Sequence, residues 1–268
     1  MAKTLLSGTF EVCVDSVASA VAAEKGGANR LELCCSLMEG GLTPSMGLVE
    51  SVLSCVSIPV RVMLRPRAGD FLYSETEFNV ILRDLALLRR TKAEGVVIGM
   101  LTHEGKVDRE RLEEFMIAAS PLKVTFHRAF DLTKSATESA RILVELGVHT
   151  LLTSGLSESA SSGVQIIKEI NDIYGLRIEV MAGGGLSEEN IEYILISTGT
   201  RAIHGSCRVV VESKMTFHRP NVPMGLPVID TACHKAASVE RVAVIKCTAE
   251  RIWKEQKTSE QSPGMSSR

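Results

Sequence analysis

Short apolar runs alternate with segments of helical periodicity along most of the 268 residues of this chain. Eight runs have the length and the Val, Ile and Leu content of buried strands: Phe10–Val14, Arg30–Cys34, Val60–Arg65, Gly95–Met100, Lys123–His127, Thr150–Thr153, Ile178–Met181 and Ala202–Ser206. The segments between them have the apolar spacing of helices: Ser16–Lys25, Ser45–Cys55, Glu75–Arg90, Asp108–Ala119, Ser135–Glu145, Ala160–Tyr174 and Ser187–Thr198. Strands joined by helices run parallel and are buried on both faces. The pattern predicts the α/β class and a single (β/α)8 TIM barrel.

The regions around the barrel are predicted from the same pattern. Residues 1–8 are expected to form a flexible leader, and residues 9–255 to contain the barrel, an irregular segment and a terminal helix. Three prolines after the eighth strand predict the irregular segment, because proline removes a backbone donor and breaks helices. Helical spacing resumes over 231–255, which predicts an additional C-terminal helix packed on the barrel or on a second subunit. The polar tail 256–268 is expected to be disordered.

Composition agrees with one domain and narrows the classes of partner. The chain is 45% hydrophobic but only 4% aromatic, which suits a barrel filled by branched aliphatic side chains. Its net charge is −2 with both signs scattered, so neither nucleic acid nor a membrane surface is an expected partner. An odd number of cysteines, seven, without a secretory signal favours reduced thiols and a cytoplasmic location.

The first two strands carry ionisable side chains on one face. Side chains alternate along a strand, so Glu11 shares a face with Cys13, and Glu32 shares one with Cys34. A carboxylate against the helix layer would be costly, so this face is expected to line the barrel interior near its open end. Cys13 and Cys34 then become neighbours, and two such thiolates can hold a soft ion such as Cu(I). The alternative is that both are buried as small apolar residues, since the chain has no CxxC spacing.

Three other strand ends carry a cation or an imidazole. Arg65 is held by Pro66 and predicts an anion-binding guanidinium, with pairing to a strand glutamate for fold reasons as the alternative. His127 and His204 end the fifth and eighth strands. A lone histidine is more often a satisfied core residue. Two histidines, two glutamates and an arginine around one barrel mouth exceed the needs of folding.

The sixth and seventh strands end in small residues that predict an anion cradle. Thr153 closes the sixth strand, and Gly184 and Gly185 come after the seventh, before a helix expected to start near Ser187. Backbone N–H groups at a helix N-terminus bind phosphate or carboxylate, and many TIM barrels bind phosphate near the last strands. The alternative is a tight turn between strand and helix.

At these residues the sequence resembles the CutC family. The motifs that carry the resemblance span about residues 10–210 in order: Glu11–Ser16, Gly26–Cys34, Gly40–Ser45, Arg65–Tyr73, Thr125–Asp131, Leu152–Gly155 and Gly183–Gly185. The Thr-Phe-His-Arg-Ala-Phe-Asp segment at Thr125–Asp131 is the most specific of them.

The resemblance implies a (β/α)8 barrel, a homo-oligomer (dimer or tetramer) and a cytoplasmic location, with a nuclear location as a further alternative. It also implies Cu(I) binding in the animal members, whose copper-linked cysteines match Cys13 and Cys34. Departures from the family pattern include Cys35 and Cys207, which offer additional thiols, and Ala182 before the glycines.

The residues and the resemblance support three interpretations. The favoured one is a Cu(I)-binding protein of copper homeostasis, without turnover. The second is a barrel enzyme acting on a small anionic or phosphorylated metabolite, with Glu11 or Glu32 as acid or base, His127 and His204 as proton carriers or electrophiles, and Arg65 as the anion anchor. The third is a scaffold in which these groups form an internal salt-bridge network. Whether the protein is an enzyme is left open by the sequence.

Overall fold

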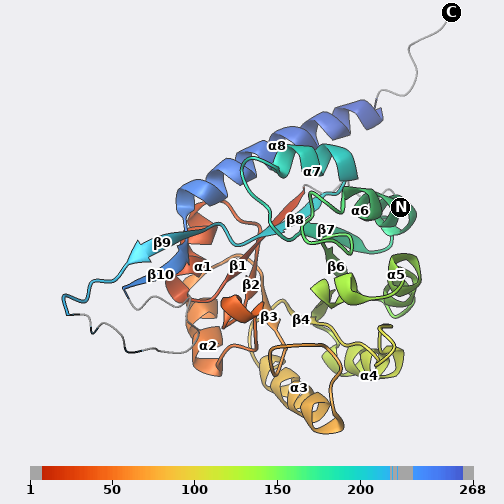
Figure 1. Ribbon diagram of the computed structural model, residues 1–268, viewed down its shortest axis with the longest axis horizontal. Coiled ribbons are helices and arrows are strands. Elements are labelled where there is room, and N and C mark those ends of the chain that lie inside the picture. Colours follow the sequence, from red (N-terminus) through yellow and green to blue (C-terminus); the bar gives the residue numbers. More distant parts are fainter. Residues whose placement is uncertain (1–7, 218, 220–221, 223–231, 262–268) are drawn as a thin grey trace, which may run out of the picture.

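A computed structural model describes residues 8–217, 219, 222 and 232–261 of the chain. In this part, eight parallel strands close into a barrel in the order β1 to β8, with helices around its outside (Figure 1). The predicted α/β class and (β/α)8 architecture are confirmed. No helix of the described residues combines the length and apolar character needed to cross a membrane.

The elements have the predicted alternation. The barrel strands are β1 (Thr9–Val14), β2 (Arg30–Leu33), β3 (Val60–Met63), β4 (Gly95–Ile98), β5 (Lys123–Phe126), β6 (Thr150–Thr153), β7 (Glu179–Gly183) and β8 (Ala202–Gly205). The helices between them are α1 (Val17–Lys25), α2 (Met46–Cys55), α3 (Glu75–Leu88), α4 (Arg109–Ala119), α5 (Ala136–Glu145), α6 (Val164–Tyr174) and α7 (Ile191–Thr198). Short 3-10 helices η1 (Leu37–Glu39) and η2 (Arg128–Leu132) lie in the loops after β2 and β5.

The alternation of side chains along each strand separates two apolar regions. Val12 and Leu31 belong to the large core between the strands and the surrounding helices. Cys13, Met63 and Val97 belong to a smaller cluster that also contains Cys34. Val12 lies opposite Leu31 in the register of β1 and β2, and Cys13 lies opposite Glu32. Because side chains alternate along a strand with a period of two residues, the ionisable face of these strands lies inside the barrel, as predicted.

A polar layer lies inside the barrel at Arg61. This side chain, which is 4% exposed, donates from Nη1 to the hydroxyls of Thr125 and Thr150, each at 2.7 Å. Its Nε pairs with Glu94 at 2.8 Å. Buried charges are tolerated where hydrogen-bond partners and a counter-ion are close, and Arg61 has both.

Two helix starts differ from the prediction. Helix α6 begins at Val164 rather than at Ala160, with Gly163 as its N-cap. Helix α7 begins at Ile191 rather than near Ser187, because the Ser187 backbone N–H donates to the Asn190 side chain at 2.9 Å and forms a turn instead. The helix predicted from Asp108 has this residue as its N-cap, since the Asp108 carboxylate accepts from the N–H of Arg111.

The chain after the barrel differs more from the prediction. Cys233–Ala237, expected to be helical, forms strand β10, which pairs antiparallel with β9 (Arg208–Glu212). Helix α8 then runs over Val239–Gln261 and so continues beyond residue 256, where disorder was predicted. The valine-rich sequence of β9 offers β10 a pairing partner that helical spacing did not reveal. Residues 1–7, the three prolines of the predicted irregular segment and 262–268 lie outside the described residues.

Helix α8 packs on the barrel's outer layer, as predicted. In Figure 1 it runs across α7 and reaches α1, and both contacts are present in the structure. Its buried face consists, from N- to C-terminus, of Val242, Ile245, Ala249, Ile252 and Trp253. The Trp253 indole is 5% exposed and donates from Nε1 to the backbone oxygen of Thr200 at 3.2 Å.

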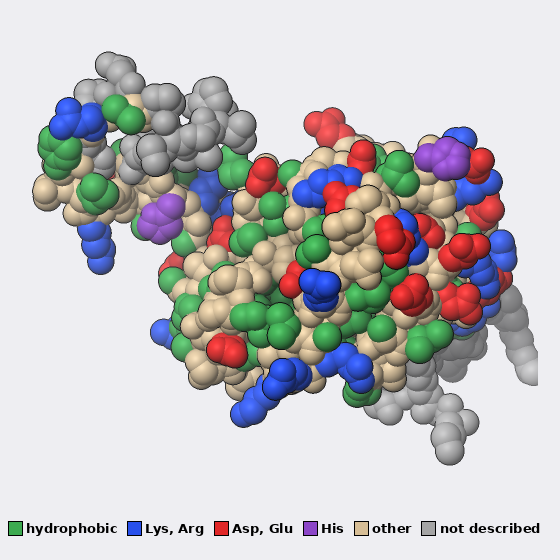
Figure 2. All heavy atoms as spheres, turned by 90° about the horizontal axis from the view of Figure 1, so that it is seen from below, with side chains coloured by type: hydrophobic (Ala, Val, Ile, Leu, Met, Phe, Trp, Pro, Cys, Tyr) green, Lys and Arg blue, Asp and Glu red, His purple; other side chains and the backbone are tan. Residues whose placement is uncertain are grey.

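Charged side chains are interspersed on the surface. Figure 2 shows Lys and Arg next to Asp and Glu over the face seen there, with apolar side chains between them and no continuous basic stripe. This distribution on that face agrees with the near-neutral net charge of −2.

Trp253→Ala tests how much α8 contributes to the barrel. We expect the free energy of unfolding to fall by about 3 to 5 kcal/mol, because the substitution removes a buried indole and leaves a cavity. Chemical denaturation measures this change. Lys254→Ala, at the exposed neighbouring position, should change stability by less than about 0.5 kcal/mol. Equal effects of the two substitutions would show that α8 is not part of the cooperative core.

Candidate functional site

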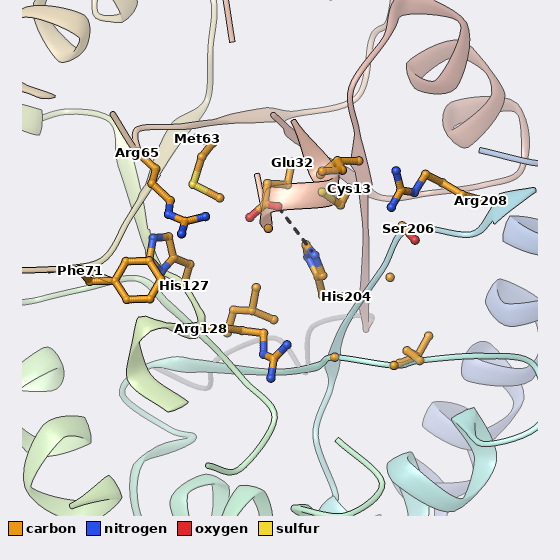
Figure 3. A pocket seen from close by; sticks show the side chains of 17 residues that line it. Cys13, Glu32, Met63, Arg65, Phe71, His127, Arg128, His204, Ser206 and Arg208 are labelled. Carbon is orange, nitrogen blue, oxygen red and sulfur yellow. Dashed lines mark ion pairs between the residues drawn. The ribbon is translucent and has the colours of Figure 1, made fainter. Parts of the chain in front are cut away.

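A pocket opens where the strands of the barrel end. Its cavity is about 280 Å³. Its wall is formed by side chains and glycines at the ends of the strands or in the adjoining loops: Cys13, Glu32, Leu37, Gly40, Met63, Arg65, Phe71, His127, Arg128, Leu152, Gly184, Gly185, Leu186, His204, Gly205, Ser206 and Arg208. Figure 3 shows Cys13, Glu32 and His204 on one side of the pocket and Arg65, His127 and Phe71 on another.

Glu11 lies beneath the pocket and not in its wall. Its fully buried carboxylate accepts a hydrogen bond from Arg30 Nε and contacts His204 Nδ1 at 2.9 Å. Arg30 also pairs with Glu179 at 2.9 Å. Burial opposes ionisation of Glu11, but Arg30, His204 and Arg61 together outweigh it and hold the pKa of the carboxyl well below its usual range. Glu11 is therefore a fixed anion that orients the His204 ring.

The pocket floor brings three potential metal ligands together. One ligand atom from each of Cys13, Glu32 and His204 lies within 4.8 Å of the others, and His204 Nε2 is 3.8 Å from a Glu32 oxygen (Figure 3). Burial and the nearby Cys13 raise the pKa of Glu32 well above its usual value. Burial disfavours a charged imidazolium, but the carboxylates and Cys13 outweigh burial and raise the pKa of His204. Glu32 Oε1 is buried without a hydrogen-bond partner.

Cys34 lies next to Cys13, as the strand pattern predicts. The two sulfur atoms are 3.8 Å apart, and Cys34 Sγ is 3.4 Å from a Glu32 oxygen. Cys34 is fully buried and stays outside the pocket wall, covered by Gly41, where an added Cβ would lie 3.0 Å from the sulfur. The hydrogen bond from Cys34 lowers the pKa of the Cys13 thiol to about 5, while the same contact raises the pKa of Cys34.

The additional thiols lie away from this pair. Cys35 faces away from the sulfur pair, and its Sγ donates to the backbone oxygen of Thr43 at 3.1 Å. Cys207 is buried in the outer core, where burial raises the pKa of its thiol to about 12. Neither side chain is part of the pocket wall.

Arg65 lies in the pocket wall. It does not form the ion pair with a strand glutamate that was the alternative to anion binding. Nη1 donates to the backbone oxygens of Glu39 and Gly41 at 2.8 and 3.1 Å, and Nη2 to that of Gly69 at 2.8 Å. Glu11, one of the partners considered for it, pairs with Arg30 instead. The guanidinium is therefore held rigidly by loop carbonyls.

His127 stands beside Arg65 in the same wall. Its Nδ1 accepts the backbone N–H of Ala129 at 3.0 Å, and its ring packs 4.9 Å from the ring of Phe71. Burial, assisted by the positive charge of Arg65, lowers the pKa of His127 to about 3. The ring is therefore neutral near pH 7 and is a hydrogen-bond donor through Nε2 rather than a cation.

The predicted anion cradle is only partly present. Gly184 and Gly185 lie in the pocket wall with φ of +103° and +70°, a conformation that glycine adopts readily. Thr153 was predicted to be part of the cradle, but it does not line the pocket. Its buried hydroxyl donates to Asp131 instead. The glycines also do not open a helix, because α7 begins only at Ile191. The expected helix N-terminus is therefore absent from the cradle.

Several site residues were missed by sequence reasoning. Arg30 is the counter-ion of Glu11, and the alternation that puts Arg30 on the same strand face as Glu32 was the available signal. Phe71, Arg128 and Arg208 line the pocket from outside the eight barrel strands, where the barrel's periodicity gives no orientation. The Arg128 guanidinium pairs with Asp131 at 2.8 Å.

Comparisons with known proteins agree with this geometry. The CutC family model matches residues 9–209. The copper homeostasis protein cutC homologs of Mus musculus and Homo sapiens are each 43% identical over 244 residues, which is 91% of this chain and 90% and 89% of those proteins. The crystal structure of a protein described as a CutC copper homeostasis protein, from Streptococcus agalactiae, superposes with a TM-score of 0.71 at 32% identity, covering 74% of this chain and 98% of that one. From its matching family model and these relatives, the chain belongs to the CutC family.

Proposed function

We propose that this protein binds Cu(I) through the sulfur atoms of Cys13 and Cys34 and takes part in copper homeostasis. The observation that carries the proposal is the 3.8 Å contact between the two sulfurs at the open end of the barrel. Thiolates are the ligands that select soft ions such as Cu(I). The names of the mouse and human relatives support the role in copper homeostasis.

The spacing of the donor atoms fits one ion. A metal–sulfur bond is about 2.3 Å long in zinc sites, so two such bonds span at most about 4.6 Å. The sulfurs of Cys13 and Cys34, 3.8 Å apart, can therefore bind the same ion with a bent geometry and without movement of β1 against β2. His204 adds an imidazole, which also suits copper, whereas the Glu32 carboxylate is a harder ligand.

The protonation of the site favours metal capture at neutral pH. A thiol binds metal as the thiolate, so its proton must leave first. Cys13, whose pKa is about 5, is already deprotonated near pH 7. Cys34 keeps its proton in the copper-free site, and Glu32, 3.4 Å away, lies where that proton can be received. One proton per bound ion is then released from the sulfur pair.

We also propose a cellular location and an oligomeric state for this protein. All seven cysteines are unpaired thiols, which supports a reducing compartment, the cytoplasm or also the nucleus. A homo-oligomer, a dimer or tetramer, is supported by the exposed apolar side chains of β9, where Val210 is 61% exposed. The partners are therefore copper and further copies of this chain.

The double variant Cys13→Ser plus Cys34→Ser tests copper binding. We expect its Cu(I) affinity to fall at least about 100-fold, because hydroxyls are poor ligands for a soft ion. The measurement is competition with a chromophoric Cu(I) chelator under anaerobic, reducing conditions. Cys55→Ser, which changes an exposed cysteine on α2, is the matched control and should leave the affinity unchanged. Wild-type affinity in the double variant would refute the proposed ligands.

The pH dependence of the thiolate tests the contact between the two cysteines. The ultraviolet absorption that distinguishes wild type from Cys13→Ser should increase as pH rises through about 5, because Cys13 loses its proton there. In Cys34→Ala the donated hydrogen bond is gone, so this transition should move to higher pH. Cys35→Ala, which removes a thiol that bonds elsewhere, should leave it in place. An unchanged transition in Cys34→Ala would contradict the role of Cys34.

A further inference from the structure

Arg65 is a buried cation without a carboxylate partner. The residue is 5% exposed, and no carboxylate of the described residues lies within ion-pair distance of its guanidinium. By contrast, the buried guanidiniums of Arg30 and Arg61 each pair with a glutamate. Arg65 uses its two Nη atoms on backbone oxygens, and its Nε is buried without a partner. Burying an uncompensated charge is expensive, so an anion from outside the chain is the missing partner.

His127 supplies a second unpartnered donor beside the first. Because Nδ1 accepts the Ala129 backbone N–H, the single proton of the neutral ring resides on Nε2. That Nε2 is buried and has no hydrogen-bond partner. Phe71 contacts both groups, with its ring 4.9 Å from the Arg65 guanidinium carbon and 4.9 Å from the His127 ring (Figure 3). The contact with Phe71 therefore places Arg65 and His127 side by side in one wall of the pocket.

The opposite wall of the pocket carries a carboxyl group, that of Glu32. Glu32 Oε1 is buried and unpartnered, and Glu32 lies across the pocket from Arg65 and His127 (Figure 3). The remaining wall between them is largely apolar, with Leu37, Met63 and Leu152. The cavity of about 280 Å³ is at the small end for a ligand pocket, so it suits a small metabolite.

We propose that this pocket binds a small carboxylate with a hydroxyl or oxo group on the neighbouring carbon. The carboxylate oxygens accept hydrogen bonds from Arg65 Nε and His127 Nε2, and the neighbouring oxygen faces Glu32. The two donors of this site are separate from the proposed copper ligands, because neither Arg65 nor His127 belongs to the set of donors around Cys13, whereas Glu32 belongs to that set and also faces the anion.

A carboxylate fits this wall better than a phosphate. A planar carboxylate has two oxygens for two donors, and the positive charge of Arg65 balances its single negative charge. A phosphate has more oxygens to satisfy and would need the cradle at Gly184 and Gly185. The guanidinium beside Gly184 is that of Arg128, which Asp131 already neutralises.

Titration calorimetry with lactate and pyruvate as probes tests the proposal on the full chain. We expect the wild type to bind at least one of them, and to bind lactate at least about tenfold more tightly than lactamide, its uncharged analogue. His127→Asn should weaken binding about tenfold or more, because the Asn side-chain oxygen can still accept the Ala129 N–H while the pocket donor is lost. Arg65→Gln should weaken it at least as much.

Controls separate this site from the protein surface and from copper. Arg83→Gln, which alters an exposed arginine on α3 outside the pocket wall, should change lactate affinity less than about twofold. His127→Asn should keep wild-type Cu(I) affinity, and Cys34→Ser should keep lactate binding, so the failure of one proposal leaves the other standing. If Arg65→Gln fails to fold, the lactate affinity of His127→Asn alone tests the proposed donors.

The proposal is overturned by any of three results. Wild-type protein that binds neither lactate nor pyruvate refutes the site. Equal affinity for lactate and lactamide, or unchanged affinity in His127→Asn, refutes the role of the two donors. Tighter binding of inorganic phosphate than of lactate shows that the pocket is built for another class of anion.

Discussion

The buried contact between Arg30 and Glu11 is the constraint on which the rest of the site depends. It joins neighbouring strands β1 and β2 at the centre of the barrel. Through Glu179 the same guanidinium reaches β7, and through Glu11 the contact reaches His204 on β8. The first and last strands are thereby connected by charge as well as by backbone hydrogen bonds. Because a buried ion that loses its partner is strongly destabilising, this network fixes both barrel closure and the orientation of the His204 ring.

The pocket is divided chemically by the strands that form it. Strands β1, β2 and β8 supply sulfur, carboxyl and imidazole groups, which suit a metal ion and a proton. The ends of β3 and β5 supply Arg65 and His127, which are donors and suit an anion. The two proposed ligands therefore occupy different walls of one cavity. Because both walls face one cavity of about 280 Å³, the charge of each ligand would change the affinity for the other.

Periodicity predicted the barrel and the sulfur pair because both depend on local rules. Alternation along β1 and β2 is enough to place Cys13 beside Cys34 once the strands are parallel. Register and loop orientation are set by packing between distant segments, and this is where prediction from the sequence was incomplete. Arg30 rather than Arg65 pairs with Glu11, and Thr153 turns to Asp131 and away from the pocket. Strand β10 was missed because its pairing with β9 joins segments that are not adjacent in the sequence.

The barrel alone carries no information on which ligand is bound. A thiamine phosphate pyrophosphorylase from Pyrococcus furiosus superposes with a TM-score of 0.58 at 14% identity, which is a likeness of fold only. Two ionisable groups distinguish this chain. One is a thiolate that is hydrogen-bonded to a neighbouring thiol, and the other is a buried guanidinium that is hydrogen-bonded to carbonyls instead of a carboxylate. Buried ionisable groups are costly to folding unless they are paired. The presence of charged groups there, facing one cavity, is therefore best explained by ligands that complete them.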